Sequence, residues 1–283
     1  MNATRIAASV DFLSRTVDSP YSRRFSLDYR IGLVTRGSKK YTYRKRVLVA
    51  DHNSIALAEP GEVHTGAPVR EPFELRMLSL QPEALAEFVP QDCGYPNALP
   101  SFDKPVFSDR ELRNLLTGLF DGIDRRHDPD CWKLYVDECL QSIVALLMAR
   151  NTSLTHQEPL TRDLQAVQRA MSLIHDLYDK PLSLEDLARE SGLPKYRFLR
   201  AFRAEVGLPP HRYQLHFRLE KAKRSIKTGT PLAEVALSSG FYDQSHFHRH
   251  FSGLIGISPH AYRLATTSLQ PASIEDRSLA ATT

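Results

Sequence analysis

The sequence is poor in cysteine. Its 283 residues include three, Cys93, Cys131 and Cys139, which are too few and too irregularly spaced for a disulfide framework. No Cys-x-x-Cys pair is present, so the chain shows no sign of a zinc ribbon or a dithiol redox site. We therefore expect a protein of a reducing compartment.

Long apolar runs are also missing. No run approaches the ~18 residues of a membrane span. Near the N-terminus, Asp11 interrupts the apolar residues Ile6, Ala7, Ala8 and Val10 before the core of a signal peptide could form. We expect a cytoplasmic chain without a membrane partner.

The apolar content that is present suffices for more than one core. A hydrophobic fraction of 42% over 283 residues predicts two domains. Charge is unevenly distributed, because residues 161–263 contain 16 Lys or Arg against 10 Asp or Glu, whereas residues 1–160 contain 20 against 21. A basic C-terminal half is typical of polyanion binding, although many solvated helical surfaces are mildly basic.

A duplicated pattern organises residues 181–263. Leu187 and Gly192 recur 48 residues later as Val235 and Gly240. In each copy an apolar helical face is followed by a glycine, which permits the positive φ of a sharp turn, and then by a second helix. Ser183 is suited to cap the first helix. Both copies therefore predict a helix-turn-helix unit.

The second helix of each copy has an apolar inner side and a polar outer side. Phe198 and Phe202 face inward in the first copy, and Phe247 and Phe251 do so in the second. Outward cationic and hydrogen-bonding side chains are the groups that read base edges and phosphates. The predicted DNA-binding residues are Tyr196, Arg197, Leu199, Arg200 and Arg203 in the first copy and Gln244, Ser245, His248 and Arg249 in the second.

A helix from Pro210 to Lys227 is predicted between the two units, since proline is tolerated at a first helical position. Its roughly 18 residues span about 27 Å at ~1.5 Å per residue, close to the ~34 Å between adjacent major-groove faces. One chain could thus offer two recognition helices to one face of DNA. This helix is basic, and we expect Lys223 to contact phosphates.

Residues 164–263 resemble the DNA-binding domain of the AraC/XylS family of bacterial transcription regulators. The most specific part is the run from Gly240 to Phe247, followed by Phe251, Gly256, Ser258 and Pro259. A simple helical bundle would not need duplicated glycine turns with polar outer faces. The resemblance implies double-stranded promoter DNA as a partner, a homodimer, and contact with RNA polymerase if the protein is an activator.

Residues 25–80 contain short strand-like runs separated by turn residues. Closely spaced antiparallel strands predict a small barrel or a double-sheet jelly roll. The segment Glu59–His64 resembles the Pro-Gly-x-x-His stretch of the cupin-like N-terminal domain found in AraC-type regulators. The predicted strands are Ser26–Val34, Lys40–Tyr43, Val47–Ala50, Ser54–Ala58 and Glu74–Leu80.

A cupin-like domain raises the question of a metal site. A metal site needs about three convergent protein ligands. Gly66 stands where a second histidine would follow His64, and His52 is the only other histidine of the predicted barrel. We therefore expect no metal, no cofactor and no catalytic residue.

The mouth of the barrel is the predicted effector site. Tyr41, Tyr43, Glu62 and His64 could hold a small molecule there, because ligand pockets favour barrel interiors with a few polar anchors. The alternative for His64 is a turn-stabilising histidine. The basic run of Arg36, Lys39, Lys40, Arg44, Lys45 and Arg46 favours a solvated hairpin over an anion site.

Two helices are predicted after the strands, one capped by Ser108 or Asp109 and one from Pro129 to Arg150. The second has more apolar positions than one buried face requires, so it could seal the barrel and also pair with a second subunit. The alternative is a hairpin that packs only within the chain.

We thus predict an α+β fold of five segments. Residues 1–105 form a cupin-like β-barrel, residues 106–150 a helical hairpin with possible dimerisation, and residues 151–160 a linker. Residues 161–263 form an all-α domain with two helix-turn-helix motifs, and residues 264–283 a disordered tail.

The predicted function is sequence-specific transcription regulation in response to a small-molecule effector. One alternative is an effector-independent regulator whose barrel serves only oligomerisation. The other is a cupin enzyme fused to a DNA-binding module, which would lack a metal-ligand triad and a nucleophile with its base.

Overall fold

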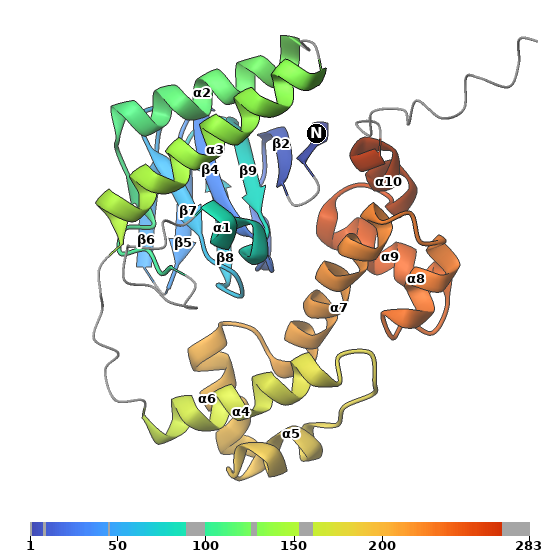
Figure 1. The fold of residues 1–283 in the computed structure, drawn as a ribbon. Coiled ribbons are helices and arrows are strands. Elements are labelled where there is room, and N and C mark those ends of the chain that lie inside the picture. Colours follow the sequence, from blue (N-terminus) through green and yellow to red (C-terminus); the bar gives the residue numbers. More distant parts are fainter. Residues whose placement is uncertain are drawn as a thin grey trace, which may run out of the picture.

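The computed structural model describes residues 2–7, 10–44, 46–88, 100–125, 129–152 and 161–267. Figure 1 shows two β-sheets and a pair of covering helices in the N-terminal half, and a group of helices in the C-terminal half. No helix in these described stretches is long and apolar enough to cross a bilayer.

All strand pairs of the N-terminal domain are antiparallel. One sheet has six strands in the order β1-β2-β9-β4-β7-β10, and the other has four in the order β3-β8-β5-β6. The strands are β1 Asn2–Ala7, β2 Val10–Val17, β3 Tyr21–Arg24, β4 Tyr29–Arg36, β5 Lys39–Tyr43, β6 Arg46–Ala50, β7 Ile55–Ala58, β8 His64–Pro68, β9 Phe73–Leu80 and β10 Val106–Phe107.

The predicted fold class is confirmed. Of the two forms that the sequence left open, a small barrel or a double-sheet jelly roll, the domain takes the double-sheet form, with two sheets that do not close into one barrel. The five predicted strands correspond to β4, β5, β6, β7 and β9, although β4 begins at Tyr29 instead of Ser26. Strands β1, β2, β3, β8 and β10 were missed. The sequences of β2, β3 and β8 carry arginines, a glycine and a proline at positions where a regular alternation of apolar and polar residues would reveal a strand.

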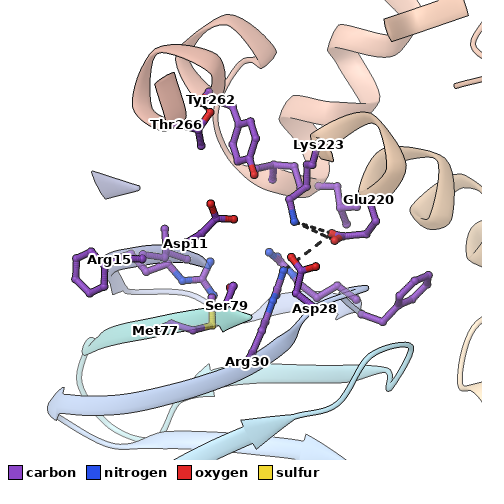
Figure 2. Close-up of a pocket in the computed structure, with 16 residues that line it drawn as sticks. Asp11, Arg15, Asp28, Arg30, Met77, Ser79, Glu220, Lys223, Tyr262 and Thr266 are labelled. Carbon is purple, nitrogen blue, oxygen red and sulfur yellow. Dashed lines mark hydrogen bonds and ion pairs between the residues drawn. The ribbon is translucent and has the colours of Figure 1, made fainter. Parts of the chain in front are cut away.

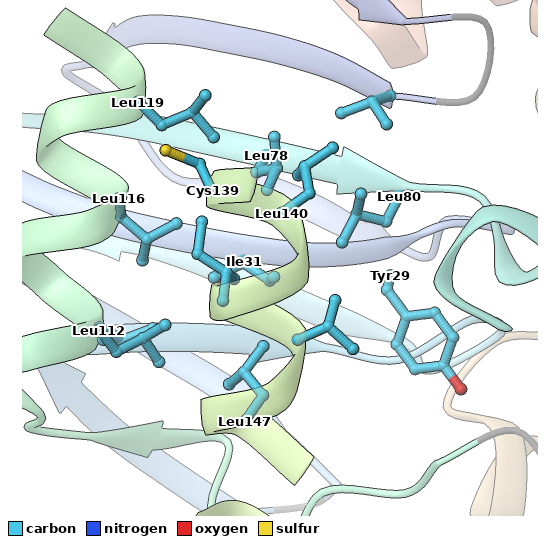
Figure 3. Packing of buried hydrophobic residues seen from close by; sticks show 14 of the residues in the cluster. Tyr29, Ile31, Leu78, Leu80, Leu112, Leu116, Leu119, Cys139, Leu140 and Leu147 are labelled. Carbon is cyan, nitrogen blue, oxygen red and sulfur yellow. The ribbon is translucent and has the colours of Figure 1, made fainter. Parts of the chain in front are cut away.

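Two long helices cover the six-stranded sheet. Helices α2 (Arg110–Arg125) and α3 (Pro129–Asn151) match the predicted hairpin. Leu116 and Leu140 pack with Ile31 of β4 in one apolar core (Figure 3). Leu134, on the other side of α3, remains 62% exposed. The prediction that α3 seals the β domain is confirmed, and its pairing with a second subunit stays a prediction.

A short helix, α1 (Pro82–Phe88), follows β9. The predicted linker begins where α3 ends, at Asn151, and residues 153–160 of it lie outside the described residues. The C-terminal domain then contains α4 Arg162–Asp176, α5 Leu184–Ser191, α6 Lys195–Val206, α7 Pro210–Lys227, α8 Leu232–Ser238, α9 Gln244–Ile255 and α10 Pro259–Thr267.

The C-terminal domain has two apolar cores joined by α7. Phe198 and Phe202 belong to the first core, and Phe247 and Phe251 belong to the second. Helix α7 contributes Phe217 to the first and Ile226 to the second. The last helix continues to Thr267, past the predicted domain end at Arg263. The predicted disordered tail otherwise lies outside the described residues.

Candidate nucleic-acid interface

The first helix-turn-helix unit consists of α5 and α6. The side chain of Ser183 accepts a hydrogen bond from the backbone N–H of Asp186, whose carboxylate accepts one from the backbone N–H of Ser183. This capping box fixes the start of α5. Gly192 ends it with a φ of 70°, as predicted for a sharp turn. Helix α6 then buries Phe198 and Phe202.

The second unit consists of α8 and α9. Asp243 caps α9, because its carboxylate accepts a hydrogen bond of 2.6 Å from the backbone N–H of His246. Phe247 and Phe251 are buried, and His250 beside them is half-buried. The second unit therefore repeats the first, but its side-chain cap is on the second helix of the unit instead of on the first.

The predicted DNA-binding residues of both helices lie mostly on open surface. Leu199 is half-buried, and Arg197 pairs with Asp163 of α4 at 2.9 Å, which leaves it less free than the others. The exposed members of the predicted set are Tyr196, Arg197, Arg200, Arg203, Gln244, Ser245, His248 and Arg249.

The turn of the second unit depends on Gly240. Its φ is 78°, and a Cβ at this position would lie 2.3 Å from the backbone oxygen of Asp179. We expect Gly240→Ala to lower the free energy of unfolding by more than ~1 kcal/mol, since left-handed strain and a backbone clash add. Chemical denaturation of the full chain measures this loss.

Gly229→Ala is the matched control. Gly229 also has a positive φ, of 88°, but nothing lies within 4 Å of the added Cβ. The free energy of unfolding of Gly229→Ala should therefore fall only by the contribution of left-handed backbone strain. Equal losses in the two variants would show that the contact with Asp179 does not constrain the turn.

A groove joins the two units. It is lined by Arg203 of α6, Arg212 of α7 and Arg249 of α9, together with His216 and other residues, and no carboxylate is among its described lining residues. Such a concentration of positive charge suits a polyanion. Sequence reasoning missed Arg212, although an exposed cation in the first turn of a helix, where the dipole disfavours it, suggests an anionic partner.

The N-terminal domain reaches the same groove. Ser22 and Arg23 line it from β3, and Arg23 Nη1 donates a hydrogen bond of 2.8 Å to the backbone oxygen of Gly207. Phe25 is buried against the C-terminal domain, with its ring 4.8 Å from that of Tyr213 and stacked on it. The position of the β domain is thus coupled to the surface between α6 and α9.

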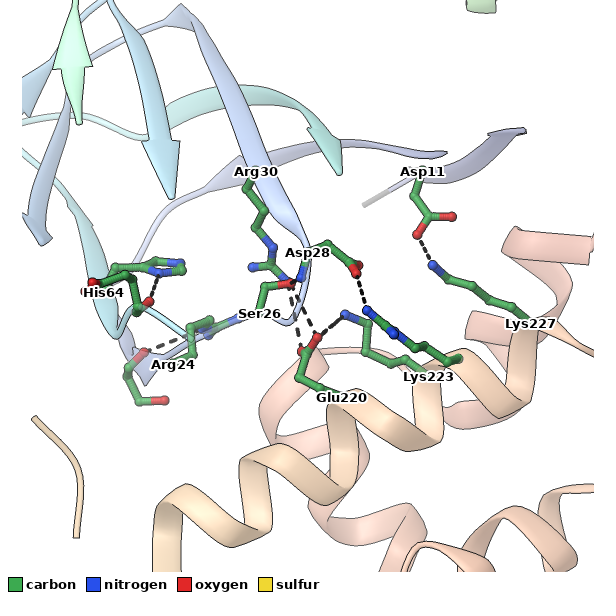
Figure 4. Close-up of polar contacts among 12 residues, drawn as sticks. Asp11, Arg24, Ser26, Asp28, Arg30, His64, Glu220, Lys223 and Lys227 are labelled. Atoms are coloured by element: carbon green, nitrogen blue, oxygen red, sulfur yellow. Dashed lines mark hydrogen bonds and ion pairs between the residues drawn. The ribbon is translucent and has the colours of Figure 1, made fainter. Parts of the chain in front are cut away.

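The prediction for Lys223 is corrected. Its ammonium group is buried and lies 2.9 Å from the carboxylate of Glu220, not on the DNA-binding surface. Two other cations of α7 also face the β domain, since Arg224 pairs with Asp28 at 3.3 Å and Lys227 pairs with Asp11 (Figure 4). The sequence shows that α7 is rich in cations, but it does not show that these cations face the β domain instead of DNA.

These contacts hold α7 against the β domain. Ser26 Oγ donates a 3.4 Å hydrogen bond to Glu220, which lies 4.0 Å from Arg30. Burial alone would raise the pKa of Glu220, but Lys223 and Arg30 outweigh it and lower the pKa, so the carboxylate stays charged. Burial lowers the pKa of His216 to about 4, which keeps this neighbour of Phe25 neutral.

The four predicted effector residues do not line one cavity. Tyr41 and His64 are buried inside the β domain and line a cavity of about 20 Å³, while Glu62 lies at the surface and pairs with Arg44 at 3.0 Å. The Tyr41 hydroxyl donates to the backbone oxygen of Leu57 at 2.7 Å. The Tyr43 ring is buried and stacked on that of Tyr41. Both tyrosines therefore fill the interior.

The predicted solvated hairpin is correct for most of its cations but not for Lys39. Arg36, Lys40, Arg44 and Arg46 are exposed, and Lys45 lies outside the described residues. Lys39 is only 5% exposed, and its ammonium lies 3.9 Å from the centre of the Tyr41 ring. Burial lowers the pKa of Lys39, and nearby Tyr21 opposes this effect.

Comparison with known proteins agrees with both halves. Residues 13–129 match the family model of an AraC-like ligand binding domain, and residues 187–265 match that of a helix-turn-helix domain. The transcriptional activator NphR of Rhodococcus sp is 28% identical over 251 residues, which cover 83% of this chain and 69% of that protein.

Two further comparisons cover about a third of the chain and nearly all of it. The multiple antibiotic resistance protein MarA of Salmonella typhimurium is 27% identical over 103 residues, or 36% of this chain and 81% of that protein. The crystal structure of ToxT from Vibrio cholerae with a bound unsaturated fatty acid has a TM-score of 0.57 at 14% identity, covering 95% of this chain and 98% of that one. This likeness shows that the two chains share their fold.

Proposed function

Since this chain belongs to the AraC family of transcriptional regulators, with a ligand-binding domain and a helix-turn-helix domain, we propose that α6 and α9 are its two recognition helices. The observation that supports this most is the repeated outer surface. Each helix follows a glycine turn, buries two phenylalanines and leaves its polar and cationic side chains exposed. Such a helix fits the major groove.

The spacing of the two helices also favours this proposal. Helix α7 has 18 residues and so spans about 27 Å, close to the ~34 Å repeat of the duplex. The cationic groove of Arg203, Arg212 and Arg249 lies between them, where a phosphate backbone passing from one major-groove face to the next would meet it. We therefore propose that the partner of this surface is promoter DNA.

We expect DNA affinity to fall steeply with salt. Arg200, Arg203, Arg212 and Arg249 are exposed, and each phosphate that such a group neutralises contributes about −0.9 to the slope of log affinity against log salt. A slope of about −3 or steeper should be measured by fluorescence anisotropy. Arg212→Ala should make it shallower by about 1 without changing sequence preference. A slope near zero would remove the electrostatic part of the proposal.

The N-terminal domain is proposed to respond to a small-molecule effector. Its contacts with α7 and with the groove give a bound molecule a physical route to the recognition helices. The effector-independent alternative keeps the β domain only as an oligomerisation module. A thermal-shift screen of metabolites against the full chain separates the two, because only an effector site produces ligand-dependent stabilisation.

We also propose that the protein acts in the cytoplasm, where promoter DNA lies, as a homodimer. Leu134 of α3 is an exposed apolar residue on the side of the helix away from the sheet, which favours a contact with a second copy. Contact with RNA polymerase would follow if the protein is an activator. Sedimentation of the full chain and of a Leu134→Asp variant tests the dimer.

A further inference from the structure

A cavity of about 80 Å³ lies where the two domains meet (Figure 2). It is bounded by β2, β4 and β9 on one side and by α7, α9 and α10 on the other. Its apolar lining comes from both domains and comprises Phe12, Leu13, Phe25, Met77, Leu254, Ile255 and Tyr262. A molecule bound here would touch the β domain and the second helix-turn-helix unit together.

The charged lining is not balanced. Four cations, Arg15, Arg24, Arg30 and Lys223, face three carboxylates, Asp11, Asp28 and Glu220. Two of the carboxylates are held by cations that do not line the cavity, since Lys227 pairs with Asp11 and Arg224 with Asp28. Among the described lining residues, Glu220 is therefore the one carboxylate that remains to balance the charge of the four cations.

Arg15 and Arg24 lie over the ring of Tyr21, at 5.0 and 4.5 Å from its centre, but the arginines have little negative charge beside them. The Nε atoms of Arg15 and Arg30 are buried and have no hydrogen-bond partner among the described residues. Burial, and then the charge of Arg15, lower the pKa of Arg24 to about 10. Burying cations near one another without counter-charge is unfavourable, so a bound anion would be stabilised here.

We propose that this cavity binds a small organic carboxylate with an apolar body, whose carboxylate takes the place of Glu220 beside Lys223 and Arg30, with Arg15 and Arg24 on the same lining. The arginines recognise the anionic group, and the apolar wall shared by the two domains covers the rest of the molecule. This inference rests on the proposed function and specifies the chemistry of its effector and the route of its signal.

The cavity is too small for the ligand, so binding requires the two domains to move apart. A cavity of about 80 Å³ holds a few water molecules, at roughly 10–15 Å³ each, but not an organic acid. The carboxylate of the ligand therefore enters only when Glu220 moves out of the cavity. This movement breaks the contacts of Glu220 with Ser26 and Arg30, which hold α7 against the β domain. Because the ligand binds the separated state better, it shifts the population towards that state.

The test uses the full chain and three probes at constant ionic strength: octanoate, the neutral octanol and the short acetate. Calorimetry should show octanoate binding at least tenfold more tightly than either of the others. Glu220→Gln should tighten octanoate binding about tenfold or more, the size of one charge-assisted hydrogen bond. Glu234→Gln, an exposed carboxylate on α8, should leave it unchanged.

Arg30→Gln should weaken octanoate binding about tenfold or more, whereas Arg36→Gln, exposed at the other end of β4, should not. Octanoate should also speed hydrogen exchange in α7. Octanol binding as tightly as octanoate, equal affinities of the Arg30 and Arg36 variants, or no octanoate binding to either the parent chain or Glu220→Gln would overturn the inference. Specific DNA binding is measured on the same preparation without octanoate. If DNA binding is intact while the octanoate results are negative, only the inference fails and the proposed function stands.

Discussion

In a selection from randomised DNA, Arg249→Ala and Arg200→Ala will each lose the preference of the parent chain at one or two base pairs. Both arginines are exposed on proposed recognition helices, Arg249 on α9 and Arg200 on α6. An arginine pairs with guanine O6 and N7, and a good bidentate contact discriminates by ~1–3 kcal/mol, or roughly 5- to 150-fold. The two variants should relax different halves of the site.

Two further variants give this experiment its controls. Arg212→Ala, in the groove between the units, should weaken all sequences alike. Arg46→Ala, exposed on β6 of the N-terminal domain, should change neither affinity nor preference. If Arg200→Ala and Arg249→Ala keep every base preference and lose only affinity, the recognition surfaces have been placed wrongly.

The isolated segment 161–283 will bind the same DNA, but about 10²–10⁴-fold more weakly than the full chain on a site with two copies of the target. Both proposed recognition helices, and the helix α7 that joins them, lie inside this segment. The loss is expected because a dimer holds its second DNA-binding domain at high effective concentration. Electrophoretic mobility shifts on single and double sites measure it.

A single target copy is the control for this prediction. On it the segment and the full chain should bind alike, apart from the contacts of the β domain with α7 that only the full chain makes. Equal affinity and stoichiometry of the two proteins on the double site would contradict a dimer role for residues 1–160.

The helical half was predictable because its signals are local. The capping Ser183, the glycines at 192 and 240, and the inward phenylalanines act within one or two helical turns of their own position. The start of α7 at Pro210 follows from the restricted φ of proline, again a local property. Where a capping residue, a turn glycine and the spacing of apolar residues all indicate the same helix, the sequence alone is enough to predict it.

The β domain was harder because its interior is partly polar. Arg15 on β2 and Lys39 on β5 point towards buried surroundings. Strand β2 therefore lacks the clean alternation that reveals a half-buried sheet, and the predicted strand over β5 begins one residue late, at Lys40. Strand β8 contains Gly66 and Pro68, and no predicted strand covers it. Interior cations of this kind are evidence of a binding site only after the strand register has brought them together.

The sequence by itself determined that this chain carries two helix-turn-helix units, where their glycine turns lie and most of the residues on their outer surfaces. Only the tertiary structure decided what the charges of α7 face. Lys223 could equally have met a phosphate, and it meets Glu220 in an interface where Ser26, 194 positions away in the chain, also bonds that carboxylate. A cation attracts any anion, and which one it meets depends on contacts between residues far apart in sequence, which no local pattern records.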